Sequence, residues 1–166
     1  MLFRSDFKWF SPLMRKFVMH QSIKLGALKQ IPVNSGKFSV ISPSASFVMG
    51  GSGMPYGEML RGYKENSVGE YYGNVMLKYS LEFRLSLSES PTIYALAFAE
   101  AGNVWEDFNS VDPFNLKRSA GVGVRLFMPM LGMLGYDMGY GFDNVGNFEN
   151  DGPRGWEHHL IFGMPF

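Results

Sequence analysis

The segment from Asn74 to Ser88 alternates between apolar and polar residues along its whole length. Its apolar positions are Val75, Leu77, Tyr79, Leu81, Phe83, Leu85 and Leu87. Because successive residues of a strand point to opposite faces, the pattern predicts a strand with one apolar and one polar face. Strands of soluble proteins usually have about 5–6 residues, whereas a strand that crosses a membrane needs roughly 9–11. The length therefore favours a transmembrane β-barrel over a soluble sandwich.

The same alternation recurs through much of the remaining chain. It predicts further strands over residues 16–28, 92–105, 117–128, 134–142 and 156–166, and the end of another over residues 7–10. We expect a turn near Ser11-Pro12-Leu13 to join the strand over 7–10 to the next one. The chain is thus predicted to be all-β, with about seven strands.

The connections between these strands alternate between short and long. The longest covers residues 29–72, and loops beyond about 12–15 residues are uncommon in compact domains and usually functional. Transmembrane barrels show this asymmetry, with short periplasmic turns and long outer loops. Single-chain bacterial barrels usually have an even number of strands, so about seven strands indicate part of a larger barrel. The pattern predicts an antiparallel transmembrane β-barrel segment that occupies residues 1–166 and forms the carboxyl-terminal part of the barrel.

Composition fits this fold class and excludes others. The chain has 15 Lys and Arg against 15 Asp and Glu, so it lacks the basic surface expected of a nucleic-acid-binding protein. Aromatic residues make up 16% of the chain and there are 20 glycines, as suits barrels with aromatic girdles. There are no cysteines, which excludes disulfides and thiolate metal sites. The first residues lack the apolar core of a signal peptide, so we expect a mature chain or a fragment.

Four segments follow one another in an order that resembles a known family. The motif Leu60, Arg61, Gly62 and Tyr63 lies in the longest connection. The other three are Phe47–Gly51 upstream of it, Tyr79–Phe83 with Phe98–Trp105, and Arg118–Val124 with the aromatic end at Phe166. Together they resemble the carboxyl-terminal part of a BamA-type outer-membrane protein assembly factor, of the bacterial surface antigen superfamily. The richness in Met and Tyr suggests a member from Bacteroidetes.

The resemblance implies a fold and a partner set for the motif. In this family the barrel has 16 strands, and the long extracellular loop, here residues 29–72, folds back to plug the lumen. Its Arg meets acidic residues on neighbouring strands, which implies that Arg61 meets Glu100, with Glu82 nearby. A guanidinium–carboxylate contact is geometrically specific and would fix a long loop. From composition alone, a solvated loop arginine is the simpler interpretation of Arg61.

The position of Glu100 leaves two alternatives open. Glu82 lies on the polar face of its predicted strand, which would be the lumen side. Strict alternation instead puts Glu100 on the same face as Tyr94, Leu96 and Phe98. Either the strand bulges near Ala101-Gly102, or bulky residues face the lumen there.

The last predicted strand has an aromatic end that is similar to the family's terminal signal. The resemblance implies that it pairs weakly with the first strand of the barrel and forms one side of a lateral gate, through Leu160, Phe162, Gly163 and Phe166. The implied function is insertion and folding of β-barrel proteins into the bacterial outer membrane. The implied partners are nascent β-barrel proteins, other subunits of the assembly machine and the lipid bilayer.

Other functions remain as alternatives. A two-partner-type secretion or transport pore of the same superfamily is the nearest, and a small anchor barrel fits the odd strand count poorly. A membrane-embedded hydrolase could be built from Asp143 and His158, although no third residue to orient the base is evident. His158 and His159 are adjacent on a predicted strand and point to opposite faces, so we expect interface or loop histidines and no metal site. We expect no catalytic residues and no cofactor.

Overall fold

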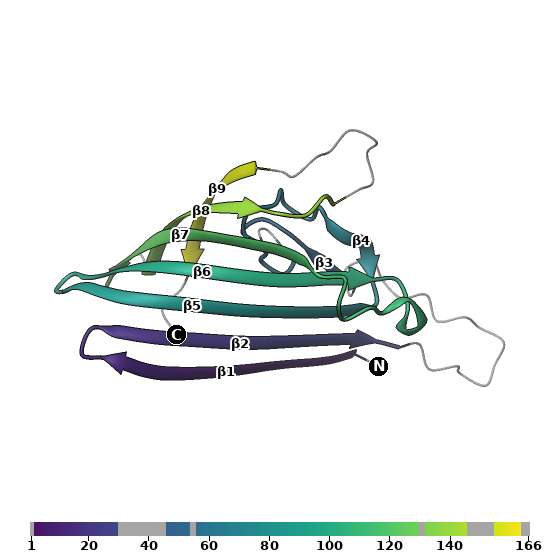
Figure 1. The fold of residues 1–166 in the computed structure, drawn as a ribbon, viewed down its shortest axis with the longest axis horizontal. Helices are drawn as coiled ribbons and strands as arrows, with labels where there is room; N and C mark the ends of the chain where they lie inside the picture. The colour runs from purple at the N-terminus through teal and green to yellow at the C-terminus, as the bar shows by residue number, and fades with distance from the viewer. Residues whose placement is uncertain (1, 30–45, 54–55, 130–131, 146–154, 164–166) are drawn as a thin grey trace.

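The computed structural model describes residues 2–29, 46–53, 56–129, 132–145 and 155–163. Seven strands form one antiparallel sheet in the order β1-β2-β5-β6-β7-β8-β9 (Figure 1). Their bounds are β1 Leu2–Met14, β2 Phe17–Leu28, β5 Val75–Glu89, β6 Thr92–Trp105, β7 Lys117–Met128, β8 Gly132–Gly141 and β9 Gly155–Gly163. The predicted all-β, seven-stranded antiparallel fold is therefore confirmed. Every neighbouring pair in the sheet is also consecutive in the chain, apart from β2 and β5, between which the long loop is inserted.

Most predicted strands lie within one or two residues of those observed, and the first strand is the exception. The turn expected near Ser11-Pro12-Leu13 is wrong, because β1 continues to Met14 and the turn falls at Arg15 and Lys16. Pro12 pairs with Val18, and the register shifts between Pro12 and Met14. Proline cannot donate a ladder hydrogen bond, but a strand tolerates it at an irregularity of this kind.

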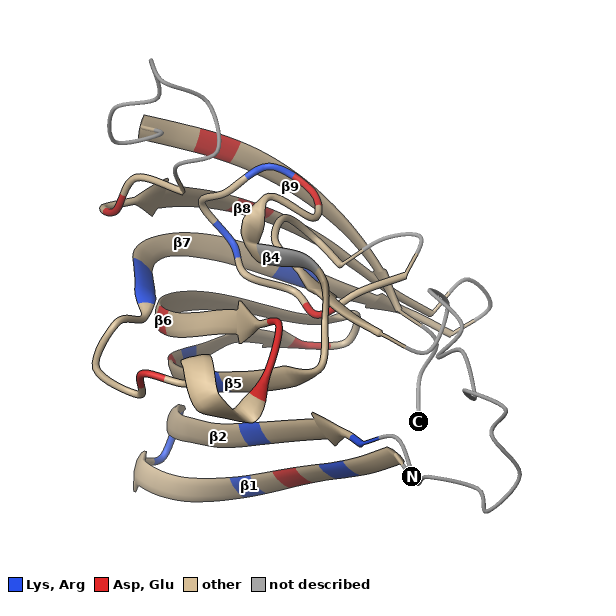
Figure 2. Ribbon diagram, turned by 90° about the vertical axis from the view of Figure 1, so that its right-hand side faces the viewer, with Lys and Arg blue, Asp and Glu red and all other residues tan. Residues whose placement is uncertain are grey.

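The long loop contains two short strands, β3 (Phe47–Met49) and β4 (Val68–Gly73), which pair with each other. Figure 2 shows that the seven-stranded sheet is strongly curved and that this part of the loop lies on its concave side. Both short strands contact β6. The buried apolar cluster accordingly lies between the loop and the seven-stranded sheet, which forms the wall. Its members are Leu28, Phe47, Met49, Leu60, Tyr63, Val68, Met76, Val104 and Val145.

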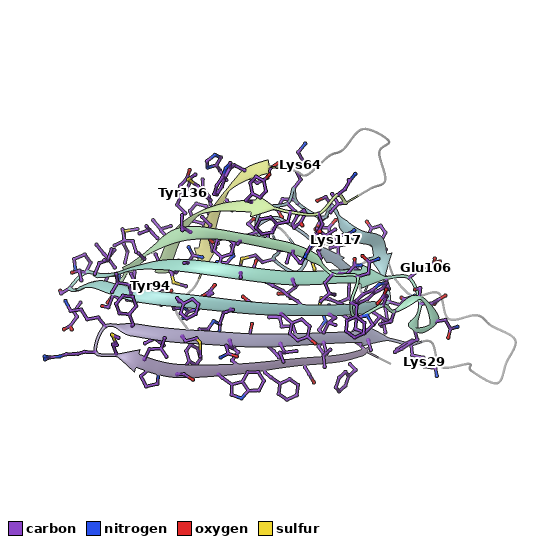
Figure 3. The ribbon with its side chains drawn as sticks, in the orientation of Figure 1. Lys29, Lys64, Tyr94, Glu106, Lys117 and Tyr136 are labelled. Carbon is purple, nitrogen blue, oxygen red and sulfur yellow. The ribbon has the colours of Figure 1, made fainter. Side chains whose placement is uncertain are left out.

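The two faces of the sheet differ in chemistry. The convex face carries large exposed apolar side chains, including Tyr79, Phe83, Val122 and Tyr136, as expected for a surface that faces lipid. The concave face carries buried polar and charged side chains. In Figure 3, Lys29, Glu106 and Lys117 lie at the end of the sheet that bears the long connections. No helix among the described residues is long and apolar enough to cross a membrane.

Candidate functional site

Arg61 lies inside the curve of the sheet and is surrounded by three carboxylates from three strands. Its Nη2 donates to Glu82 Oε1 on β5 at 2.7 Å and to Glu100 Oε1 on β6 at 2.7 Å. Its Nη1 donates to Asp137 Oδ2 on β8 at 3.1 Å, and its backbone amide donates to Glu100 Oε2 at 2.9 Å. Only 1% of the Arg61 residue surface is exposed. One loop side chain therefore connects three strands of the wall.

The strand carrying Glu100 is regular at that point, which decides between the two alternatives for its position. The register of β5 with β6 and of β6 with β7 continues unbroken through Ala101-Gly102. Leu96 and Phe98 are buried on the same concave face as Glu100, so bulky residues do face inward here. Phe98 has a role in the site, because the Arg61 guanidinium lies 3.7 Å from its ring centroid in a cation–π contact.

The backbone of the motif passes close to the wall because the wall is built of glycine there. Gly62 has φ +86°, and a Cβ on it would lie 2.8 Å from the Tyr140 carbonyl carbon. On the strand side, a Cβ on Gly139 would lie 2.5 Å from the Gly62 nitrogen. The Gly-rich inner face of β8 is thus the surface on which the motif rests.

Tyr63 completes the contact of the motif with the wall. Its side-chain hydroxyl donates to the backbone carbonyl of Arg118 on β7 at 2.6 Å, and the residue is fully buried. Burial raises the pKa of Tyr63 to about 12, because the charged phenolate is poorly solvated in this position. Leu60 is also fully buried, within the apolar cluster beneath the loop.

Glu58 forms a second anchor of the loop, and no sequence pattern singled it out. Its Oε1 accepts from Lys24 Nζ on β2 at 2.6 Å and lies 4.0 Å from Lys78 Nζ on β5. Lys78 in turn lies 3.1 Å from Glu100 Oε1. Lys78 therefore connects the Glu58 anchor to the carboxylates around Arg61.

Asp137 is the acidic residue whose role sequence reasoning missed. The alternation of β8 places it on the polar face, but that pattern alone indicates only a wet lumen with mixed charge. The structure buries it completely, where it accepts from Arg61 and from Arg125 Nη2, the latter at 2.7 Å. A Cβ on Gly123 would collide with its carboxylate, so the glycine on β7 makes the space that Asp137 occupies.

The buried charges around the motif balance one another. Among the described residues, the charged side chains classed as buried are Arg61, Lys78, Arg125, Glu82, Glu100 and Asp137. Burial disfavours the charged guanidinium, but the carboxylates of Glu100, Glu82 and Asp137 outweigh this and raise the pKa of Arg61 above its ordinary value. Arg61 therefore stays charged. Removing it would leave three buried carboxylates with one buried cation too few, and an uncompensated buried charge typically costs about 3–5 kcal/mol.

The last strand also reaches the motif, through a residue assigned no such role from sequence. His159 Nε2 on β9 lies 3.0 Å from the backbone nitrogen of Gly62 and accepts its hydrogen bond. The expectation of interface or loop histidines is wrong for this residue, because β9 carries it inward. The expectation that the two histidines point to opposite faces is confirmed, since His159 is buried and His158 is exposed.

The remaining candidates are distributed as follows. Asp143 and His158 are not brought together: Asp143 pairs with Arg118 Nη2 at 2.8 Å, and His158 contacts the Tyr136 hydroxyl at 2.7 Å. Leu160 and Phe162 are exposed on the outer face of β9, where Gly163 ends the strand. Phe166 lies outside the described residues. Within the described part of the chain, no group of three or more His, Cys, Asp or Glu side chains could hold a metal ion.

Comparison with models of known protein families found a match. A model of the Omp85 superfamily domain matches residues 2–159, which is nearly the whole chain. The chain belongs to the Omp85 superfamily. The Omp85 match covers the loop motif, all three carboxylates around Arg61 and His159. No curated protein was found to match the chain.

Membership of the Omp85 superfamily determines the coarse class of function. The superfamily comprises outer-membrane β-barrel proteins of assembly and transport, which insert or secrete other proteins. It includes BamA-type assembly factors as well as two-partner secretion pores. A curved antiparallel sheet with an apolar convex face and a charged concave face fits an Omp85 barrel segment.

Proposed function

We propose that this protein is a BamA-type assembly factor that inserts and folds β-barrel proteins into the outer membrane. The chain would then be the carboxyl-terminal part, residues 1–166, of a larger 16-stranded barrel. Its partners would be nascent β-barrel proteins, other subunits of the assembly machine and the lipid bilayer. On this proposal the protein is not an enzyme. An origin in Bacteroidetes stays a prediction from the richness in Met and Tyr.

The observation that carries the proposal is the docking of the long loop on the wall through Arg61. A loop held by three strands at once can brace the wall of a barrel, since each buried ion pair is costly to break on its own. The docked loop would hold one part of the wall fixed while another part of the wall opens.

The moving part, on this proposal, is β9. Among the described residues it pairs with β8 alone, and in the proposed barrel its other edge would pair only weakly with the first strand, so that its N–H and C=O groups could be released. An unpaired edge is a template for addition of another strand. Leu160, Phe162 and Gly163 of β9, with Phe166 beyond the described residues, would form one side of the lateral gate. Nascent strands would pair with this edge before they leave into the bilayer.

The test uses the intact protein reconstituted into liposomes. A urea-unfolded eight-stranded barrel protein is diluted into them, and its folded fraction is followed by the shift in gel migration that heating abolishes. We expect several-fold faster folding than in protein-free liposomes, and a lower rate with Arg61→Ala. A rate equal to that of protein-free liposomes contradicts the proposal.

The same liposomes test the rival pore. A secretion pore would move an unfolded polypeptide into the liposome interior, where added protease cannot reach it. Protease protection of a non-barrel polypeptide, without faster folding of the barrel client, would favour the pore over the assembly factor.

A further inference from the structure

Among the described residues, the last strand pairs with a single neighbour, β8. The register of β8 with β9 runs from Met133 opposite Gly163 to Gly141 opposite Gly155, and no other described strand pairs with β9. On the proposed function β9 is the strand that opens, and in the open state β8 alone would hold it by a backbone ladder. The position of β9 therefore depends more on its side-chain contacts with the loop than the position of an inner strand does.

His159 is the one residue of β9 classed as buried. The other inward positions of the strand, Glu157 and Ile161, are only partly buried. The imidazole reaches across to the loop, where its Nε2 lies 3.0 Å from the Gly62 nitrogen. A backbone N–H can only donate, so Nε2 is the acceptor, and the ring is the neutral tautomer with its proton on Nδ1.

Gly62 also packs against β8, independently of its contact with His159. A Cβ on Gly62 would lie 2.8–2.9 Å from backbone atoms of Tyr140 and Gly141, so only a glycine fits this close to the strand. Arg61, one residue earlier, is held by Asp137, and Asp137 is the residue directly opposite His159 in the ladder of β8 with β9. β8 thus holds the side chain of Arg61 through Asp137, and β9 holds the backbone amide of Gly62 through His159.

We infer that His159 is a positioning residue that ties the last strand to the docked loop, so that release of the loop frees β9 and movement of β9 weakens loop docking. This rests on the proposed function, because it assigns the tie to the strand proposed as the gate. The imidazole acts through the Gly62 amide and does not contact a client. Breaking the tie removes one buried hydrogen bond, which corresponds to roughly a 2- to 10-fold change in the fraction of open β9.

The chain offers well-matched variants. His159→Phe keeps an aromatic ring of similar size but has no acceptor. His159→Gln supplies a side-chain carbonyl at a similar reach and restores the acceptor. His158→Gln is the control, because His158 is the adjacent histidine of the same strand, yet it faces outward and stacks on Tyr136 at 5.9 Å between ring centroids.

The experiment measures the position of β9 in the intact protein in liposomes. The sequence of this chain has no cysteine, so spin labels are introduced through Ala97→Cys on β6 and Leu160→Cys on β9, both exposed on the outer face. The distribution of distances between the labels reports the open fraction. We expect His159→Phe to raise it roughly 2- to 10-fold, while His159→Gln and His158→Gln stay at the wild-type value.

Coupling to the loop is tested by combining His159→Phe with Arg61→Ala. If Arg61→Ala acts on β9 through the tie, the single variant raises the open fraction of β9. The same substitution then adds nothing further in the His159→Phe background. A wild-type distance distribution in His159→Phe, or strictly additive effects in the double variant, overturns the inference. Folding of the eight-stranded client is measured in parallel with unlabelled wild-type protein, because Leu160 is itself a proposed gate residue. Failure of the wild-type protein there contradicts the proposed function, whereas the distance data decide the tie separately.

Discussion

At the scale of single residues, Arg61 dominates the docking of the loop. Its guanidinium meets Glu82, Glu100 and Asp137, and its face lies on the Phe98 ring. A planar guanidinium can donate to several acceptors in fixed directions, whereas an ammonium is a compact point charge. The charge of Arg61 is thus matched to three fixed carboxylates, and the site is sensitive to its replacement even by lysine.

We expect Arg61→Ala to destabilise the docked loop by about 3–5 kcal/mol, since it leaves the buried carboxylates one cation short of balance. Arg61→Lys should rescue only part of this. Hydrogen–deuterium exchange of the amides in residues 56–73 measures the change, as faster exchange of the released loop. Lys64→Ala is the control, because it removes an exposed cation three residues further along the same loop. Wild-type protection in Arg61→Ala would contradict the assignment.

We expect ionisation of Tyr63 to weaken docking of the loop at alkaline pH. Its pKa is about 12 in the structure against 10.0 for an unperturbed tyrosine, so the protonated hydroxyl is favoured in the docked state. This contribution is fully present below about pH 10 and is lost as the pH rises through about 12. We expect a spin label introduced by Lys64→Cys to gain mobility across that range. Tyr63→Phe, which cannot ionise or donate, should abolish this transition, and an unchanged transition would contradict the role of Tyr63.

At the scale of elements, β8 is the strand that the motif lies against, and glycine makes this possible. A Cβ on Gly139 would lie 2.5 Å from the Gly62 nitrogen and 2.9 Å from its Cα, both of them backbone atoms. Because these are backbone atoms, no change of a side-chain rotamer would make room for the Cβ. The loop and β8 are therefore complementary along their backbones.

We expect Gly139→Ala to weaken loop docking by about 2 kcal/mol or more, in the range of overpacking changes, while β8 itself still forms. Gly163→Ala is the comparison, because its Cβ would meet Met133 side-chain atoms at an ordinary 3.7–3.9 Å. Protease cleavage within residues 56–73 reports docking. Equal protease resistance of the loop in the two variants would show that the close approach is not required.

The elements differ in how far the sequence alone could predict them. Period-two alternation gave β6 over residues 92–105 and β7 over residues 117–128 with the bounds observed. It failed at Pro12, where the register of β1 with β2 shifts, because strands tolerate proline at such an irregularity. β3 has three residues, too few for any period to show, and its strand conformation depends on its pairing with β4 in the loop.

At the scale of the whole molecule, the site is an assembly of residues far apart in the sequence. Local alternation shows that Glu82 and Asp137 face inward, but it cannot show that both meet Arg61. The Arg61–Glu100 pairing came from resemblance to a family, whereas Asp137, Glu58 and His159 required the fold. Contacts such as Gly62 with His159 depend on how the loop enters the curve of the sheet, and no short-range pattern records that.

The measurement that tests the account most directly is crosslinking of a client during insertion. A photoreactive amino acid is placed at Leu160 on β9 or, as the control, at Ala97 on β6, both on the outer face of the sheet. The intact protein in liposomes is illuminated while it folds an eight-stranded barrel. The account predicts crosslinks to the client from position 160 and few from position 97. Client folding without crosslinks at position 160, or with equal crosslinks at both positions, would contradict a gate at the last strand.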